Sequence, residues 1–143
     1  MNIIHVTKEN AQAWAQLCCE LWPDHTVTEM LAEFDDGAYQ YEYLLEIDNT
    51  YQAFVSLSIR HDYVEGKTES GPVGYLEGIY VRPEYRQKGA AKALVNFART
   101  WSAERGCSML ASDCELWNEE SRQFHNKVGF SEESVNVHFT MPL

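Results

Sequence analysis

A strand–helix–strand unit in the middle of the chain restricts the possible folds more than any other segment. Val73–Val81 (VGYLEGIYV) is apolar enough to be a central strand, and Cys107–Ser112 is a second apolar run. The helix predicted between them spans Gly89–Arg105 and ends before Gly106. Because a helix connects the two strands, they should run parallel, joined by a right-handed crossover. The inner face of this helix follows the 3.6-residue period through Ala91, Leu94, Val95, Ala98 and Trp101.

The flanking segments predict more strands and helices around this unit. With 143 residues, the chain has the length of one domain, residues 1–143. The order of elements indicates an α/β (α+β) fold, a mixed sheet covered by helices. The expected elements are a strand at Asn2–Val6, a helix capped by Thr7 and ending at Leu21, a helix from Thr26 or Thr28 through Phe34, a hairpin of Tyr41–Ile47 and Gln52–Ile59, a helix at Asn118–Val128 and a last strand at Val135–Thr140.

Charge is distributed unevenly along the chain. The formal net charge is −11, and residues 1–81 hold three basic and fourteen acidic side chains, whereas residues 82–143 hold eight of each. Such a surface repels nucleic acid and anionic membranes, so we expect neither as a partner. The acidic half favours a cationic ligand and the balanced half an anionic one, although solubility alone also explains the bias.

Cysteine usage and hydropathy indicate a cytoplasmic protein. No apolar run approaches the ~20 residues of a membrane helix, and the N-terminus lacks a secretory signal. The cysteines form no CxxC and no histidine stands at zinc-ligand spacing, so we expect no metal site and no catalytic cysteine. Buried, reduced thiols are expected at Cys18, Cys19, Cys107 and Cys114.

The start of the central helix has the features of an anion site. Gly89 permits a tight turn, and a helix N-terminus carries partial positive charge. Arg86, Lys88 and Lys92 add full charges. The segment is neither a Walker A loop nor GxGxxG. On the residues alone, a simple turn and a phosphate site are equally compatible with it.

Two motifs resemble those of the GNAT acyl-CoA N-acetyltransferases. R-x-x-G-x-A (Arg86, Gly89, Ala91) is similar to that family's pyrophosphate-binding motif. The segment from Asn118 to Phe130 resembles its N-x-x-A-x-x-F-Y-x-K-x-G-F pattern, with histidine at the tyrosine position. The resemblance implies a central mixed, mostly antiparallel sheet with one parallel splayed strand pair, about four flanking helices, and acetyl-CoA as co-substrate.

A narrower resemblance is to the aminoglycoside 6′-N-acetyltransferases of Gram-negative bacteria. It rests on E-L-W ending at Trp22, on Ser58–Gly66 (SIRHDYVEG), on Ser70–Val81 (SGPVGYLEGIYV) and on Leu110–Asp113 (LASD). It implies direct acetyl transfer to the 6′-amine of a polycationic aminosugar antibiotic, hence antibiotic resistance, and a possible homodimer that exchanges its last strand and hairpin. The acidic first half of the chain agrees with a cationic acceptor.

The resemblance also implies which residues hold the cofactor. Backbone groups of the central strand would pair with the pantetheine and polarise the thioester, and amides at the helix start would hold the pyrophosphate. Asn118 is a helix N-cap on its own pattern, and the resemblance adds a hydrogen bond to pantetheine. The cofactor residues are Ile79, Tyr80, Val81, Gln87, Lys88, Gly89, Ala90, Ala91, Lys92 and Asn118.

Glu77 is the expected catalytic base. A carboxylate inside an apolar strand is costly unless it faces a cleft, a partner or water. The functional interpretation is that Glu77 binds the substrate ammonium and takes its proton, through a water molecule. Gly78 beside it marks a bulge or a close approach of another chain segment.

The remaining site residues have two interpretations each. Asp113 follows an apolar strand and either binds the aminosugar or is a loop carboxylate. Trp22 and Tyr63 either stack on sugar rings or pack in the core. His125 is either the general acid for the departing thiolate, or it lines the site while water protonates the thiolate. Two other functions stay open: acetylation of another cationic amine, such as a polyamine or peptide, and a non-catalytic acyl-CoA sensor.

Overall fold

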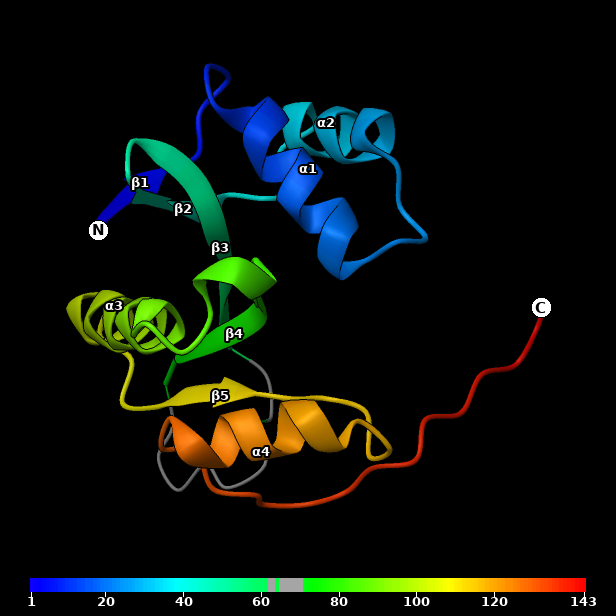
Figure 1. Ribbon diagram of the computed structural model, residues 1–143. Coiled ribbons are helices and arrows are strands. Elements are labelled where there is room, and N and C mark those ends of the chain that lie inside the picture. Colours follow the sequence, from blue (N-terminus) through cyan, green and yellow to red (C-terminus); the bar gives the residue numbers. More distant parts are fainter. Residues whose placement is uncertain (62–63, 65–70) are drawn as a thin grey trace.

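The computed structural model describes residues 1–61, 64 and 71–143, and its core is one five-stranded sheet (Figure 1). The strand order is β1-β2-β3-β4-β5; the first four strands are antiparallel, and β4 pairs with β5 in parallel. The expected mixed sheet and its parallel pair are therefore confirmed. The elements are β1 (Asn2–His5), α1 (Ala11–Leu21), α2 (Val27–Asp35), β2 (Tyr41–Ile47), β3 (Thr50–Arg60), β4 (Val73–Val81), a 3₁₀ turn (Pro83–Tyr85), α3 (Ala90–Glu104), β5 (Leu110–Ser112) and α4 (Glu119–Lys127).

Helices cover both faces of the sheet. On one face, α3 packs Leu94, Ala98 and Trp101 against apolar side chains of β2, β3 and β4. On the other face, α1 and α2 bury Trp14 and Met30 against the same strands. In Figure 1, α1 and α2 lie on one side of the sheet and α3 on the other, with α4 beside β5. None of the helices in the described ranges is long and apolar enough to cross a membrane.

The predicted hairpin forms, and its turn explains the register. Asp48 and Asn49 both have positive φ, 52° and 64°, as a two-residue hairpin turn requires. Ile47 therefore pairs directly with Thr50, and β3 begins two residues earlier than expected.

A β-bulge on β4 sets the position of Glu77. Ser56 pairs with Gly78, and the next residue of β3, Leu57, pairs with Leu76, so Glu77 is the extra residue. Such a bulge redirects a side chain at the edge of a site. The bulge suggested by Gly78 is thus confirmed.

Three local expectations are wrong. Helix α1 begins at Ala11, not at Thr7, because Asn10 takes the cap position and its Oδ1 accepts from the Thr7 amide at 2.8 Å. Strand β5 spans three residues instead of Cys107–Ser112. Only one of the four cysteines, Cys18, is fully buried, and Cys114 is exposed; all four are free thiols.

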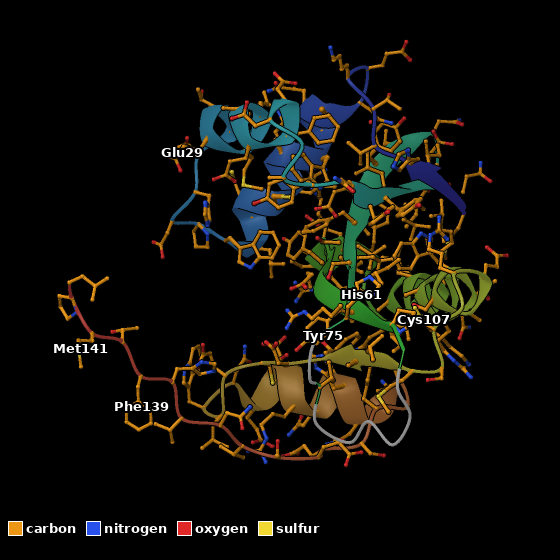
Figure 2. The ribbon with its side chains drawn as sticks, turned by 180° about the vertical axis from the view of Figure 1, so that it is seen from behind. Glu29, His61, Tyr75, Cys107, Phe139 and Met141 are labelled. Atoms are coloured by element: carbon orange, nitrogen blue, oxygen red, sulfur yellow. The ribbon has the colours of Figure 1, made fainter. Side chains whose placement is uncertain are left out.

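The last strand expected at Val135–Thr140 does not form within this chain. Residues 130–143 carry no paired strand, and the segment runs away from the domain (Figure 1). Alternating apolar side chains stay exposed along it, and Figure 2 shows Phe139 and Met141 far from the core. The sequence alternates as a strand does, but a strand forms only where a neighbouring backbone pairs with it.

Candidate active site

The two parallel strands separate immediately after three residue pairs. Gly74–Leu76 of β4 pairs with β5, whereas Ile79 and Val81 pair only with β3 among the described residues. Apart from the Val81 carbonyl, which accepts from Arg86, the N–H and C=O groups on the other edge of Ile79–Val81 are therefore available to an extended polar ligand. The predicted cofactor-binding strand residues lie at this opening.

The start of α3 presents free amides close to the end of β4. Gly89 adopts φ 85° and Gln87 φ 61°, which turns the chain sharply into the helix. The bond from the Ala93 amide to the Gly89 carbonyl, 2.9 Å, closes the first helical turn. The amides before Ala93 precede the helical ladder and have no intrahelical acceptor. Together with the helix dipole they give the start of α3, at Ala90, Ala91 and Lys92, the donors and the partial positive charge that favour an anion.

Arg86 holds this loop against the strand. Its Nε donates to the Val81 carbonyl at 2.8 Å, and its guanidinium lies 5.7 Å from the centre of the Tyr80 ring. Lys88 lies equally far from the Tyr85 ring. Arg86 thus fixes the loop geometry as well as adding positive charge.

Glu77 lines a cavity of about 640 Å³ on the α1 side of the sheet, which we name the Glu77 cavity. Glu77 accepts from the Ser58 hydroxyl at 2.6 Å and from Arg60 Nη2 at 2.9 and 3.1 Å. The glutamate is thus neither isolated nor buried in the strand, but faces a cleft with partners. The cavity is lined by Trp22, Gly37, Ala38, Tyr39, Gln40, Tyr41, Glu42, Ser56, Leu57, Ser58, Ile59, His61 and Glu77.

A chain of contacts links Glu77 to Asp113. The Arg60 guanidinium lies 3.4 Å from the centre of the Tyr75 ring, and the Tyr75 hydroxyl donates to Asp113. Burial and the Asp113 carboxylate raise the pKa of Tyr75, so the phenol stays a donor. The structure thereby connects the two carboxylates that sequence analysis singled out. It also adds Arg60 and Tyr75, which that analysis did not assign.

His125 lies where the strands part. Its Nδ1 donates to the Ser121 carbonyl at 2.7 Å, and its Nε2 is 2.8 Å from the Ser112 hydroxyl. Ser112 and Leu76 form the last pair of the parallel strands, and the Ser112 oxygen is 3.1 Å from the Leu76 carbonyl. Because both ring nitrogens are bonded, a proton from His125 would leave through Ser112.

The other predicted residues have simpler positions. Asn118 is the N-cap of α4, with its side chain accepting from the Ser121 amide at 3.1 Å, so the capping interpretation is confirmed. Trp22 lies in the wall of the Glu77 cavity. Tyr63 lies outside the described residues. Within the described ranges, no three His, Cys, Asp or Glu side chains are grouped as metal ligands.

Comparison with known proteins finds a matching family and similar proteins over nearly the whole chain. Residues 6–130 match the acetyltransferase (GNAT) family. The aminoglycoside N(6′)-acetyltransferase type 1 of Stenotrophomonas maltophilia is 37% identical over 147 residues, covering 99% of this chain and 94% of that protein. An apo crystal structure of aminoglycoside 6′-N-acetyltransferase AAC(6′)-IG from Acinetobacter haemolyticus superimposes with a TM-score of 0.91 at 34% identity, covering 100% and 99% of the two chains. AAC(6′)-Iy in complex with the bisubstrate analogue CoA-S-monomethyl-acetylneamine gives 0.90 at 32% identity, covering 99% and 98%.

The family match and the full-length relatives identify this mixed α/β domain as an acyltransferase domain. The chain belongs to the acetyltransferase (GNAT) family, and it is an acetyltransferase.

Proposed function

We propose that this protein transfers the acetyl group of acetyl-CoA directly to the 6′-amine of aminoglycoside antibiotics. The observation that carries the proposal is the place of Glu77, at the β4 bulge, between the open strand edge and the Glu77 cavity. The full-length relatives named for this activity support the same acceptor.

In this proposal the protein holds acetyl-CoA through backbone groups. The pantetheine pairs with the open edge of Ile79, Tyr80 and Val81, which directs a strand amide at the thioester oxygen. The diphosphate binds the amides from Gln87 to Lys92, where the helix dipole favours negative charge. Asn118, while capping α4, adds a contact to the pantetheine.

The acceptor amine enters from the Glu77 cavity. Glu77 takes a proton from the ammonium through a water molecule, and the neutral amine attacks the thioester carbon. The C–N bond forms as the C–S bond breaks, the nitrogen releases its second proton to solvent, and His125 supplies a proton to the thiolate through Ser112. Asp113, Trp22 and Tyr63 bind the remaining rings and ammonium groups of the aminosugar.

A pair of closely matched antibiotics tests the proposal. Neomycin carries a 6′-amine, and paromomycin carries a hydroxyl at the same position. With acetyl-CoA, neomycin should release free CoA thiol and gain one acetyl group at N6′ by NMR, whereas paromomycin should give no N6′ product. Equal acetylation of both, or of neither, would contradict the proposal.

Two other functions give different results in the same assay. An acetyltransferase for another cationic amine would show a higher kcat/KM with spermidine or a basic peptide than with neomycin. A silent acyl-CoA sensor would bind CoA but release no thiol with any amine. The described hydrogen bonds of His125 favour catalysis over the sensor, because they connect it to the splay point of the strands.

We also propose that the protein is a homodimer built through its C-terminal segment, residues 131–143. Phe139 and Met141 are 89% and 81% exposed, which is unusual for side chains of this size. Their alternation with polar residues suits pairing with a sheet edge of a second copy. Light scattering should give a dimer for the full chain and a monomer after deletion of residues 131–143.

We further propose that the reaction takes place in the cytoplasm and confers antibiotic resistance. Expression in a susceptible bacterial host should raise the inhibitory concentration of neomycin but not that of paromomycin. Cell fractionation should recover the protein with the cytoplasmic enzymes.

A further inference from the structure

Glu42 is a fully buried carboxyl group with no ion pair and no well-formed hydrogen bond among the described residues, although the Ser56 hydroxyl beside it lowers its pKa. The residue is 1% exposed, and neither side-chain oxygen has a hydrogen-bond partner among the described residues. Two other buried polar side chains are paired: Ser102 bonds to Ala98, and Gln52 bonds to Thr50 and Arg82. An unpaired buried carboxyl costs several kcal/mol of folding free energy and calls for an explanation.

The sheet register places Glu42 in line with the catalytic bulge. Glu42 pairs with Ser56, and Ser56 pairs with Gly78 beside Glu77. Neighbouring strands lie about 4.8 Å apart, so Glu42 on β2 and Glu77 on β4 are separated by the width of one intervening strand, β3. Both line the Glu77 cavity.

The residues next to Glu42 on β2 show on which face of the sheet its side chain lies. Tyr43 and Leu45 pack on the α3 side, and Leu44 packs on the α1 side. Because side chains alternate along a strand, Glu42 shares the α1 side with Leu44. Its carboxyl group therefore lies just beneath the cavity surface, between β2 and α1.

The titratable groups that face Glu42 are acids. They are the Cys18 thiol of α1, the Tyr39 phenol before β2 and the Glu77 carboxylate of β4, while Tyr39 itself donates to Glu33 of α2. Burial first, and then Glu77, raises the pKa of Glu42 to about 8, against a lowering by the Ser56 hydroxyl. Arg60 lies outside the cavity lining and is bonded to Glu77, and His61 is the basic side chain that lines the cavity.

We propose that Glu42 is a second anchor for the cationic acceptor, neutral in the free protein and ionised in the complex. When an ammonium group settles in the Glu77 cavity, the O–H bond of Glu42 breaks, its proton passes to solvent, and an ion pair forms with the ammonium. No electron is transferred. Acceptor binding is thereby coupled to the release of one proton.

This inference rests on the proposed function, since it takes a polyamine-like aminosugar as the ligand. It adds a specificity determinant that is distinct from the base. A cation that reaches only Glu77 forms one exposed ion pair, whereas one that also engages Glu42 gains a desolvated partner. Polycationic amines are thus selected over monoamines.

Calorimetry tests the coupling directly. Neomycin binding to the CoA-bound protein is measured at pH 7 in buffers of different ionisation enthalpy, which yields the number of protons exchanged. The wild type should release close to one proton more than Glu42→Gln, and Glu42→Gln should raise the KM for neomycin about tenfold with kcat within about twofold. Glu46→Gln, on the same strand but outside the cavity, should match the wild type in both readouts.

A second measurement does not depend on a variant. With ¹³C-labelled glutamate carboxyls, the Glu42 signal should report a neutral acid at pH 7 and shift to the carboxylate when neomycin is added. An unshifted signal, or equal proton release by wild type and Glu42→Gln with equal KM, overturns the inference while leaving the proposed function standing. Failure of the wild type to acetylate neomycin overturns the proposed function, and this inference with it.

Discussion

The indole ring of Trp22 lies directly against Gly78, so that a Cβ atom at position 78 would be 2.7 Å from Cη2 and Cζ2 of the ring. This contact holds the end of α1 on the β4 bulge. Gly78→Ala should therefore destabilise the fold by about 1–3 kcal/mol and lower kcat, since the ring or the bulge must move. Thermal unfolding and steady-state kinetics measure both effects.

A double-mutant cycle provides the control. In the Trp22→Ala background, the added methyl group has no ring to meet, and Gly78→Ala should cost at least ~1 kcal/mol less. An equal cost in both backgrounds would mean that the glycine is needed for another reason.

Replacing Glu77 by Gln should reduce kcat/KM by roughly 10²–10⁴-fold, because the acceptor then keeps its proton. The Glu77–Arg60 pair is about one-third exposed, so its loss should change the free energy of unfolding by less than about 1 kcal/mol. Glu77→Gln should therefore lose most of its activity while keeping nearly the stability of the wild type.

Glu20→Gln is the matched control. Glu20 pairs with Arg82 at the same N–O distance, 2.9 Å, and with similar exposure. It should show the same small change in stability with unchanged kcat. If Glu77→Gln retains wild-type activity, Glu77 is not the base.

The His125 hydrogen bonds predict a relay through Ser112. His125→Gln and Ser112→Ala should each lower kcat about 10–100-fold, because both interrupt proton delivery to the thiolate. Ser121→Ala keeps the backbone carbonyl that accepts from Nδ1 and should stay near wild type. Unchanged kcat in His125→Gln would assign protonation of the thiolate to water.

Because the pKa of the buried Glu42 is raised, its contribution to the free energy of unfolding decreases as the pH rises. Its folded pKa, about 8, lies above the value of 4.5 expected in the unfolded chain, so the folded state binds the extra proton. The stabilisation is complete below about pH 4.5 and is lost as the pH rises through 8. Between these values the free energy of unfolding of the wild type should fall relative to Glu42→Gln, by up to about 1.4 kcal/mol per pH unit.

Denaturant titrations at pH 5, 6, 7 and 8 measure this difference. Glu46→Gln should run parallel to the wild type. A constant difference between wild type and Glu42→Gln across the range would show that Glu42 does not change protonation on folding.

The sequence predicted those parts of the fold that local pattern determines. Strand β4 and its boundaries follow from one apolar run, and the Asp48–Asn49 turn follows from residues that tolerate positive φ. Gly78 inside the strand predicted a bulge or a close approach, and the structure shows both. The prediction of a last strand at Val135–Thr140 was wrong for the opposite reason. The alternation of apolar residues can be seen in the local sequence, but whether another strand lies beside the segment cannot.

The sequence singled out Glu77 because it stands inside an apolar strand, and Asp113 because it follows a strand and the family resemblance favours it. It did not single out Arg60 and Glu42, because an arginine at a strand end and a glutamate between tyrosines are typical of solvated residues. Their roles arise from the bulge and from the strand register, which bring β2, β3 and β4 together.

Binding of CoA to a pair of glycine variants tests the central claim most directly, that amides at the start of α3 hold the diphosphate. Gly89 and Gly106 lie at opposite ends of this helix with similar φ, 85° and 78°, and nothing lies within 4 Å of a Cβ added at either. Alanine should therefore strain both positions alike, at about 1 kcal/mol each. By calorimetry, Gly89→Ala should weaken CoA binding at least about tenfold and Gly106→Ala should leave it unchanged; equal affinity in the two variants, or no heat of binding in the wild type, would contradict the account.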